Sequence, residues 1–596
     1  MALITHNWKR FSLRRLVYLP HLFSREEKRS LLLFGAVAFL SIIGLLSRIY
    51  VSVTNQIPAV GGSYTEGLTG EPRTINPLYS SRDDDRDIER LVFSSLLRYD
   101  EKGHIQNDLA EHYEISPDGK TYSIALRKNA LWHDGKQVST DDIAFTIKTI
   151  QNPQYKSPLW INWQGVVVEK IDEHTIRFVL RNAYAPFIEN LTVGILPKHL
   201  WENIKPEQAI LHDLNVKPIG SGPYRFSSFQ KDNNGIILSY TLTQNPHYYR
   251  EGPYIKTIKL LFFKNGEEVF NAWQRGLIDG FGPVLANHFF DIQKKRGTVY
   301  PLYMPRVFGV FFNQTHASAL ADKNVRKAIG YAIERNTLAA AAPSGGFISE
   351  NSPLPWLGNE NPNSTDSSSP HQTTSNSSTS DPEKARQILE KAGWNGTNDQ
   401  GIRIKKNAVK KNTSKKSASS GSQGEQSLSF TLVTADWPDL VSVAERMKSQ
   451  LKEVGIGITV EKMPFDELES NVIRPRNFDI LLFGEVYGFE PDPFAFWHSS
   501  QIKDPGLNIS LYASKKADGV LETARKTSDP DLRRTNYQQL SQILKEDQPA
   551  IFLFSQLYYY LLPTNLQGVK LGKISLPADR FNTIPLWFRS TRRVFK

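Results

Sequence analysis

Apolar and polar residues follow alternating strand and helix periods over the last third of the chain. After Ser427 the sequence SLSFTLVT predicts a strand, residues 438–454 a helix, IGITVEKM a strand, residues 465–473 a helix, and FDILLFG a buried strand. This order is typical of an α/β sheet that is partly parallel. Ligands of such sheets gather beyond the carboxyl ends of the strands, so the residues after FDILLFG are candidates for a binding site.

The first half of the chain predicts a mixed α/β arrangement. TYSIALRKNALWHDGKQVSTDDIAFTIKTI reads as a strand, a turn at Asp134-Gly135 and a helix whose start at Ser139 and Asp142 resembles a capping box. Further strands are predicted for TIRFVL, LSYTLTQN and IKTIKLLFF. A chain of 596 residues is too long for one hydrophobic core, so we expect several lobes.

The N-terminus has the pattern of a membrane anchor. Residues 1–29 carry a net charge of +5, and an uncharged apolar run over 31–46 follows. We predict a basic cytoplasmic segment at 1–29 and a transmembrane signal anchor at 30–53, with the large body exported. A cleaved signal peptide is the alternative, although no A-x-A-like site follows the apolar run.

Two polar segments are predicted to be disordered inserts, at 358–380 and 403–426. The first is rich in Ser, Thr, Asn and Pro, and the second in Lys, Ser, Gly and Asn. Between them DPEKARQILEKAGW predicts a helix with Asp381 as its N-cap and Pro382 in its first turn. The inserts are therefore expected to be loops of one ordered domain.

The positive charge does not indicate nucleic-acid binding. Of the total of +11, residues 402–424 contribute +7 and residues 1–29 contribute +5, which leaves −1 for the rest of the chain. The folded body is thus close to neutral, and we expect no nucleic-acid partner.

Sequence motifs for catalysis, cofactors and metals are missing. The chain has no cysteine, no Walker A pattern, no G-x-G-x-x-G opening a helix, no G-x-S-x-G and no H-E-x-x-H, and its 13 histidines are scattered. We expect no catalytic residue, no metal and no cofactor. A glycosidase-like carboxylate pair in FEPDP is the enzymatic alternative, but turn chemistry explains that stretch more simply.

Several stretches together resemble the extracellular solute-binding proteins of family 5, the peptide- and nickel-binding class that feeds ABC importers. They include GLTGEPRTINPLYS, LVFSSLLRYD, SPDGKTYSIALRKNALWHDGKQVSTDDIAFTI, IGSGPYRF, DKNVRKAIGYAIERNTL and DPEKARQILEKAGW, in the family's order between about residues 60 and 590. The resemblance implies a periplasmic-binding-protein type II-like clamshell of three lobes behind the transmembrane helix. Its expected parts are lobe I at 58–88, 213–300 and 557–596, lobe II at 89–212, and lobe III at 301–556 with both inserts.

The function implied by the resemblance is capture of a peptide or similar small solute between lobes I and III, for delivery to the permease and ATPase subunits of an ABC importer. Two alternatives remain at this point. One is a receptor of the same fold that does not serve transport, and the other is an extracytoplasmic hydrolase.

The candidate ligand-binding residues lie in two segments. In oligopeptide binders of this family, the segment after the FD strand of lobe III supplies an aspartate for the peptide amine; matched through Asp492-Pro493, that acid falls on Phe489 here. Glu485 or Glu490 is the expected substitute, since a buried amine needs a carboxylate, and a non-peptide ligand is the alternative. The loop before DIERLVF is expected to face the ligand from across the cleft. The full set is Arg82, Asp83, Asp84, Gly484, Glu485, Tyr487, Phe489, Glu490, Trp497 and His498.

Overall fold

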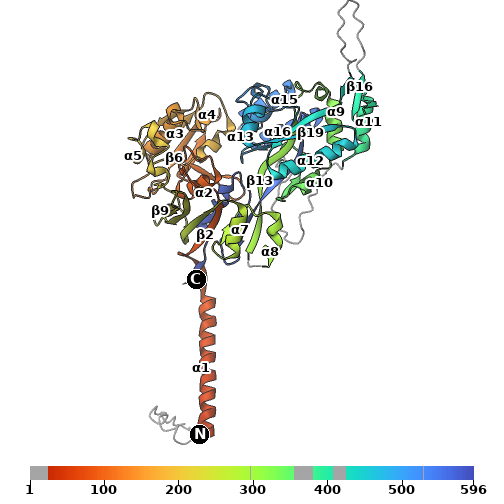
Figure 1. The fold of residues 1–596 in the computed structure, drawn as a ribbon. Helices are drawn as coiled ribbons and strands as arrows, with labels where there is room; N and C mark the ends of the chain where they lie inside the picture. Colours follow the sequence, from red (N-terminus) through yellow and green to blue (C-terminus); the bar gives the residue numbers. More distant parts are fainter. Residues whose placement is uncertain (1–23, 295–296, 355–356, 358–379, 407–424, 528) are drawn as a thin grey trace, which may run out of the picture. The chain divides into compact units, whose positions relative to one another are not determined.

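The computed structural model describes residues 24–294, 297–354, 357, 380–406, 425–527 and 529–596 (Figure 1). The chain divides into two compact units. One unit combines Met1–Val60 with Ser590–Lys596, and the other is Gly61–Arg589. The predicted basic segment 1–29 lies outside the described residues except for its last six positions.

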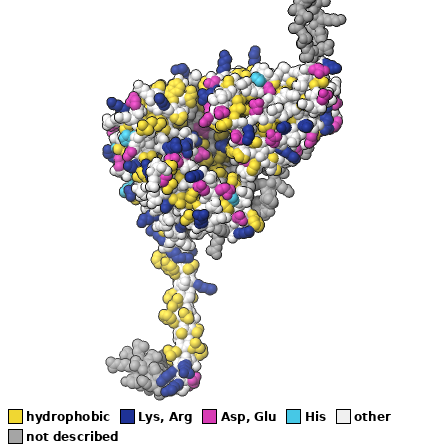
Figure 2. All heavy atoms as spheres, in the orientation of Figure 1, with side chains coloured by type: hydrophobic (Ala, Val, Ile, Leu, Met, Phe, Trp, Pro, Cys, Tyr) yellow, Lys and Arg dark blue, Asp and Glu magenta, His cyan; other side chains and the backbone are white. Residues whose placement is uncertain are grey.

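The first unit is built on helix α1 (Arg25–Val53). The helix begins at residue 25 because Ser24 and Glu27 form a capping box, in which each side chain accepts a hydrogen bond from the other's backbone N–H. All its residues are exposed, and most of its visible side chains are hydrophobic (Figure 2). It is long and apolar enough to cross a membrane.

A short antiparallel ribbon follows α1 directly. Strand β1 (Thr54–Ala59) pairs with β22 (Ser590–Phe595), the last strand of the chain. The guanidinium of Arg593 donates to Thr54 Oγ1 at 3.1 Å, and the backbone N–H of Lys596 donates to Val53 O. The C-terminus is thereby fastened to the end of the helix.

The second unit contains a large mixed sheet, with 11 strands among the described residues. Strand β13 (Gly297–Phe312) and strand β21 (Ala550–Pro563) are its two long antiparallel strands and lie next to each other in its middle. On one side of this pair lie β20 (Ile480–Val486), β18 (Ser429–Ala435) and β19 (Gly457–Met463). On the other side lie β12 (Gly280–Phe281), β2 (Gly61–Thr69), β11 (Ile255–Phe263), β10 (Ile237–Gln244) and β9 (Tyr224–Lys231), and β14 (Phe347–Ser349) pairs with β21 off this path.

A second, antiparallel sheet forms from residues 110–179. Its order is β5 (Ala110–Ile115), β6 (Thr121–Leu126), β8 (Thr175–Val179) and β7 (Val167–Lys170). Helix α3 (Thr140–Gln151) belongs to this part and begins as predicted, because the backbone N–H of Ser139 donates to Asp142 Oδ2 at 2.9 Å.

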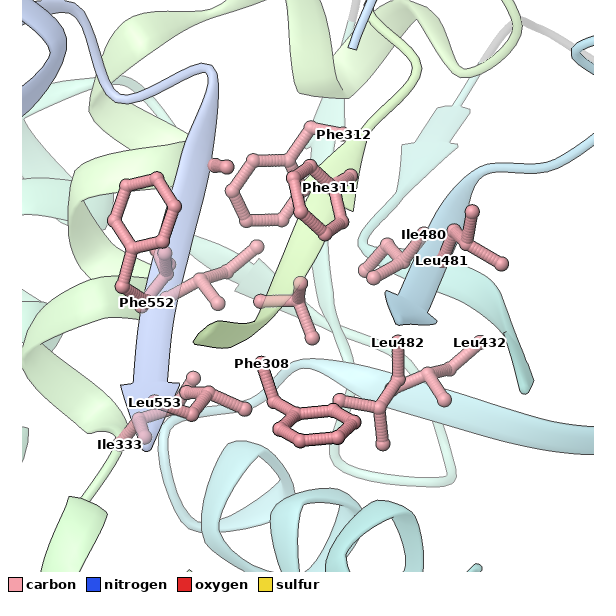
Figure 3. Packing of buried hydrophobic residues seen from close by; sticks show 14 of the residues in the cluster. Phe308, Phe311, Phe312, Ile333, Leu432, Ile480, Leu481, Leu482, Phe552 and Leu553 are labelled. Carbon is pink, nitrogen blue, oxygen red and sulfur yellow. The ribbon is translucent and has the colours of Figure 1, made fainter. Parts of the chain in front are cut away.

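The buried hydrophobic residues of the described chain form two large clusters and one small one. The first core draws on residues 64–262, 302–304 and 558–587, and the second core on residues 307–554. The small cluster joins residues 269–292 to Leu561. Figure 3 shows part of the second core, where Phe308 lies close to Leu482 and Leu432.

The elements predicted after Ser427 are confirmed. Strands β18 and β20 are parallel neighbours, β18 and β19 likewise, and helix α12 (Pro438–Glu453) connects β18 to β19. Residues 465–473 are helical, as α13 (Phe465–Leu468) and a π-helical turn over Glu469–Ile473. Helix α11 (Pro382–Lys391) has the predicted cap, in which Asp381 Oδ1 accepts from the N–H of Lys384 at 2.8 Å.

The predicted bounds of the second insert, 403–426, include residues at both ends that form strands. Residues 358–379 and 407–424 lie outside the described residues, but Arg403–Lys406 forms β16 and Glu425–Ser427 forms β17, in a small sheet with β15 (Gly396–Thr397). Composition alone missed these strands because their order comes from distant partners. The guanidinium of Arg403 donates to the carbonyls of Val454 and Trp394, at 3.0 and 2.9 Å.

Candidate functional site

A cavity of about 190 Å³ lies where the two long central strands change register. Residue Tyr303 of β13 pairs with Leu557 of β21, and the next paired residues are Val307 and Ser555, so Met304–Arg306 stand opposite Gln556 alone. The lining residues are Leu68, Thr69, Asp83, Asp84, Asp87, Gly282, Pro283, Met304, Arg306, Trp437, Gln556, Leu557, Tyr558 and Pro577.

The sequence explains why the strand bulges here. Pro305 has no N–H for the ladder, and proline is found in sheets mainly at edges and bulges. Its carbonyl instead accepts a hydrogen bond from the N–H of Tyr487, at 2.9 Å. A bulge redirects the neighbouring side chains, and it places Met304 and Arg306 among the residues that line the cavity.

The acidic residues at the start of helix α2 (Asp83–Val92) form one wall of the cavity. Two of them are neutralised within the protein. Asp84 accepts hydrogen bonds from the Arg82 guanidinium, at 3.0 and 2.9 Å, and from the N–H of Glu71. Asp87 receives two hydrogen bonds from Arg580, at 2.7 and 2.6 Å.

Asp83 differs from these two acids. Its side chain is 62% exposed, and its ion pair to the Arg86 guanidinium is long, at 3.8 Å. Of the three acids in the cavity, Asp83 is therefore the one whose charge is most available to a ligand. The predicted residue Arg82 acts indirectly, because it holds Asp84.

Trp437 forms an apolar wall of the cavity that the sequence reading missed. It lies two residues after the end of β18, as the N-cap residue of α12, and the residue is 37% exposed. Its ring contacts Phe308 of the second core edge-on, with centroids 6.2 Å apart. Ligands gather beyond the ends of parallel strands, and this rule predicts the residues after β18 as well as those after β20.

The strand alternation decides where residues 484 and 485 lie. Gly484 stands opposite Phe308, and a Cβ on Gly484 would come within 2.9 Å of that ring. Glu485 stands opposite Val307 and is buried on the other face of the sheet. Neither residue lines the cavity.

Glu485 belongs to a buried polar cluster with Tyr487 and Trp497. The Tyr487 hydroxyl donates to Glu485 Oε2 at 2.7 Å and accepts from the indole N–H of Trp497 at 3.3 Å. The other carboxyl oxygen of Glu485 is buried without a hydrogen-bond partner among the described residues. Burial raises the pKa of Glu485 to about 8, which keeps the group neutral at pH 7.

The residues at 488–490 contact the part of the chain that contains residues 99–189. The ring of Phe489 lies 4.4 Å from that of Tyr99 between centroids. The carboxylate of Glu189 accepts from the N–H of Glu490 at 2.9 Å and from the Tyr99 hydroxyl at 3.0 Å. Burial raises the pKa of Glu189 to about 7. A Cβ on Gly488 would come within 2.4 Å of Glu189 Oε1, so glycine permits this contact.

The remaining predicted residues also lie away from the cavity. Glu490 forms an ion pair with Arg533 at 3.0 Å. His498 stacks on Phe494, with centroids 4.0 Å apart, and its Nδ1 lies 2.8 Å from Ser500 Oγ. Of the ten predicted residues, the structure brings Asp83 and Asp84 to this cavity, and neither expected substitute for the amine-binding acid lines it.

A second cavity, of about 300 Å³, has a different lining. Three cations and two carboxylates line it, and Arg250 is already paired with Asp108 at 3.3 Å. Solute pockets combine apolar walls with a few polar groups, which favours the first cavity as the binding site. No group of three metal-ligating side chains occurs among the residues that the structure describes. The lining residues of the second cavity are Arg98, Glu101, Arg250, Glu251, Lys570, Asn582, Thr583, Pro585 and Leu586.

Comparison with known families decides the class of protein. The model for the middle part of the bacterial extracellular solute-binding proteins, family 5, matches residues 104–506. The chain belongs to this family. The family resemblance and the mixed α/β fold predicted from the sequence are thereby confirmed, and the family is one of solute-binding proteins rather than enzymes. The division into three lobes stays a prediction.

Relatives of this family 5 protein cover most of its length. The oligopeptide-binding protein AppA of Bacillus subtilis is 29% identical over 525 residues, which are 86% of this chain and 90% of AppA. The dipeptide-binding protein of Escherichia coli is 23% identical over 471 residues, which are 75% of this chain and 80% of that protein.

Two solved structures of similar proteins contain ligands. AppA of Bacillus subtilis in complex with a nonapeptide is 26% identical, with a TM-score of 0.67 over 90% of this chain and 100% of AppA. NikZ of Campylobacter jejuni in complex with Ni(L-His) is 25% identical, with a TM-score of 0.67 over 88% of this chain and 99% of NikZ. The family 5 fold therefore extends over nearly the whole of this chain.

The neutral state of Glu485 predicts a specific pH dependence of stability. Its pKa is about 8 in the folded protein, against an ordinary value of 4.5. The folded state thus holds the proton more tightly, and the stability contributed by this group is complete below pH 4.5 and is lost as the pH rises to 8, by at most about 1.4 kcal/mol per pH unit. Glu485→Gln cannot ionise, so its stability relative to the parent should increase from pH 5 to pH 8.

Urea unfolding midpoints at pH 5, 6.5 and 8 measure this difference. Glu461→Gln, at an exposed position of β19, is the control and should follow the parent at every pH. Parallel curves for the parent and Glu485→Gln would contradict a neutral buried carboxyl.

Proposed function

We propose that this family 5 protein is a membrane-anchored, extracytoplasmic receptor that captures short peptides and delivers them to an ABC importer. The observation that carries the proposal is the cavity at the β13–β21 bulge. It combines an available carboxylate, a guanidinium and a tryptophan face between the two cores. Such a set suits a ligand with charged ends and apolar side chains.

Peptide capture is further supported by the relatives. AppA and the Escherichia coli protein are named for oligopeptide and dipeptide binding, and the AppA structure contains a nonapeptide. In this proposal Asp83 meets the amine of the peptide. Asp84 and Asp87 are already engaged by Arg82 and Arg580, so Asp83 replaces Glu485 and Glu490 as our choice for this role.

Anchoring is supported by helix α1 and by the ribbon that follows it. The helix has 29 residues and includes the uncharged run at 31–46. The pairing of β1 with β22 holds the C-terminal strand beside the segment that directly follows the helix. We infer that the helix is retained in the mature protein and that the N-terminus stays cytoplasmic, because the basic residues precede the helix.

Closure of the lobes on the peptide would bend β13 and β21 near their register change.

The amine role of Asp83 predicts a selective loss of binding. Asp83→Asn should weaken binding of peptides with a free N-terminus by on the order of tenfold, or about 1.4 kcal/mol. Binding of the same peptides with an acetylated N-terminus should not change. Calorimetric titration of the full-length protein in detergent measures both. Asp399→Asn, at an exposed position, is the control; equal losses for free and acetylated peptides would contradict the assignment.

The anchor predicts where the mature protein is found. Expressed in a bacterium, the full chain should fractionate with the membranes and keep its original N-terminus. Edman sequencing or intact-mass measurement of the membrane fraction tests this. A mature protein that begins after Val53 would show that the segment is a cleaved signal peptide.

A further inference from the structure

The guanidinium of Arg306 has no hydrogen-bond acceptor in the cavity. Its Nε is shielded from solvent and has no hydrogen-bond partner among the described residues, and no ion pair or other hydrogen bond to its side chain occurs there. The bulge of β13 holds the residue in place through its backbone, since Arg306 pairs with Val486 of β20.

Three other arginines whose side chains are buried or half-buried have acceptors. Arg326 donates four hydrogen bonds to backbone carbonyls, at 2.7–3.0 Å. Arg335 donates to the carbonyl of Phe552 at 2.8 Å, and Arg580 bridges Glu66 and Asp87. Arg306 is half-buried and lacks such support for its shielded Nε, and a donor that is removed from water is costly unless it is paired.

Electrostatics in the cavity favour one kind of partner. Burial lowers the pKa of Arg306, and the negative charge of Asp83 opposes this shift without pairing with the guanidinium. A carboxylate can accept two parallel hydrogen bonds from a guanidinium and carries a single charge. A phosphate carries more charge and would face Asp83, Asp84 and Asp87 in the same cavity. A carboxylate is therefore the better match.

Arg306 and Asp83 also come from different parts of the fold. Asp83 begins α2, whose apolar residues belong to the first core, whereas Arg306 precedes Val307 and Phe308 of the second core. A ligand with an amine and a carboxylate would thus link both cores, with Trp437 and Met304 beside its apolar part.

We propose that Arg306 binds a carboxylate of the captured solute, and that this cavity selects zwitterionic or acidic peptides. The proposal rests on the proposed peptide-binding function and extends it to the chemical class of the ligand. The carboxylate has two possible sources, the C-terminus of the peptide or an aspartate or glutamate side chain.

Three peptide libraries distinguish these sources. Equilibrium dialysis of the full-length protein in detergent, with mass-spectrometric detection, is run with random tetrapeptides that have a free C-terminus. The second library has C-terminal amides and no Asp or Glu, and the third has C-terminal amides with one fixed Glu. We expect the parent to bind the first or third library, and Arg306→Gln to weaken that binding on the order of 100-fold.

Preference for the first library identifies the C-terminal carboxylate, and preference for the third over the second identifies a side chain. Equal binding of all three libraries by the parent, unchanged in Arg306→Gln, overturns the proposal while peptide capture stands. If the parent binds no library, peptide capture itself fails, and the same dialysis with succinate and glutamate then tests Arg306. Absence of Arg306-dependent binding of these acids also overturns the proposal.

Two further variants separate binding from folding. Arg306→Lys keeps the charge but cannot donate two parallel hydrogen bonds to a carboxylate. Its affinity should therefore fall between that of the parent and that of Arg306→Gln. Arg446→Gln, at an exposed position of α12, is the matched control and should bind like the parent. The melting temperature of Arg306→Gln should equal that of the parent, because no intramolecular hydrogen bond of this side chain is lost. A lower melting temperature with unchanged carboxylate preference would show a structural role instead and would contradict the proposal.

Discussion

The pairing of β13 with β21 is the constraint on which the rest of the structure depends. β13 runs from the first core into the second and β21 runs back from the second into the first, so the chain between them can form a separate core without losing its connection to the sheet. Pro305 interrupts this pair because it cannot donate to the ladder. The interruption falls between the cores, and the cavity lies there, among side chains supplied by both sides.

Charge compensation within the protein determines which groups in the cavity are available to a solute. Arg580 is fully buried and bridges Glu66 and Asp87, and so connects β2, α2 and the segment after β21. Removal of the Arg580 guanidinium would leave both buried carboxylates without their cation, at a cost of about 3–5 kcal/mol. These pairs fix the wall of the cavity and leave Asp83 and Arg306 as the groups with the most capacity to bind a ligand.

Local sequence patterns predicted the elements of the fold well, because their causes are local. The cap at Asp381 and the alternation through β18, α12 and β19 depend on neighbours a few residues apart. Asp83 and Asp84 could be predicted from the loop expected before DIERLVF, whose family counterpart faces the ligand, although the structure places both residues in the first turn of α2. Trp437 could also be predicted, because ligands gather beyond the ends of parallel strands and this residue follows β18.

Other parts of the site depend on pairing across long distances in the chain, which one sequence does not reveal. The register of β20 against β13 determines which face of the sheet Gly484 and Glu485 occupy, because a shift of one residue exchanges the faces. Arg306 lies at the bulge only because β21, some 250 residues later in the chain, pairs with β13 on both sides of it. The strand β16 likewise needs acceptors from Trp394 and Val454.

The central claim is that the solute binds at the bulge between the two cores. A crystal structure of the protein with a bound peptide tests it most directly. The account predicts electron density for the peptide in the cavity lined by Asp83, Arg306 and Trp437, with the amine nearer Asp83 and a carboxylate at Arg306. Density in the cavity lined by Arg98 and Lys570, with the bulge cavity filled by water, would contradict it.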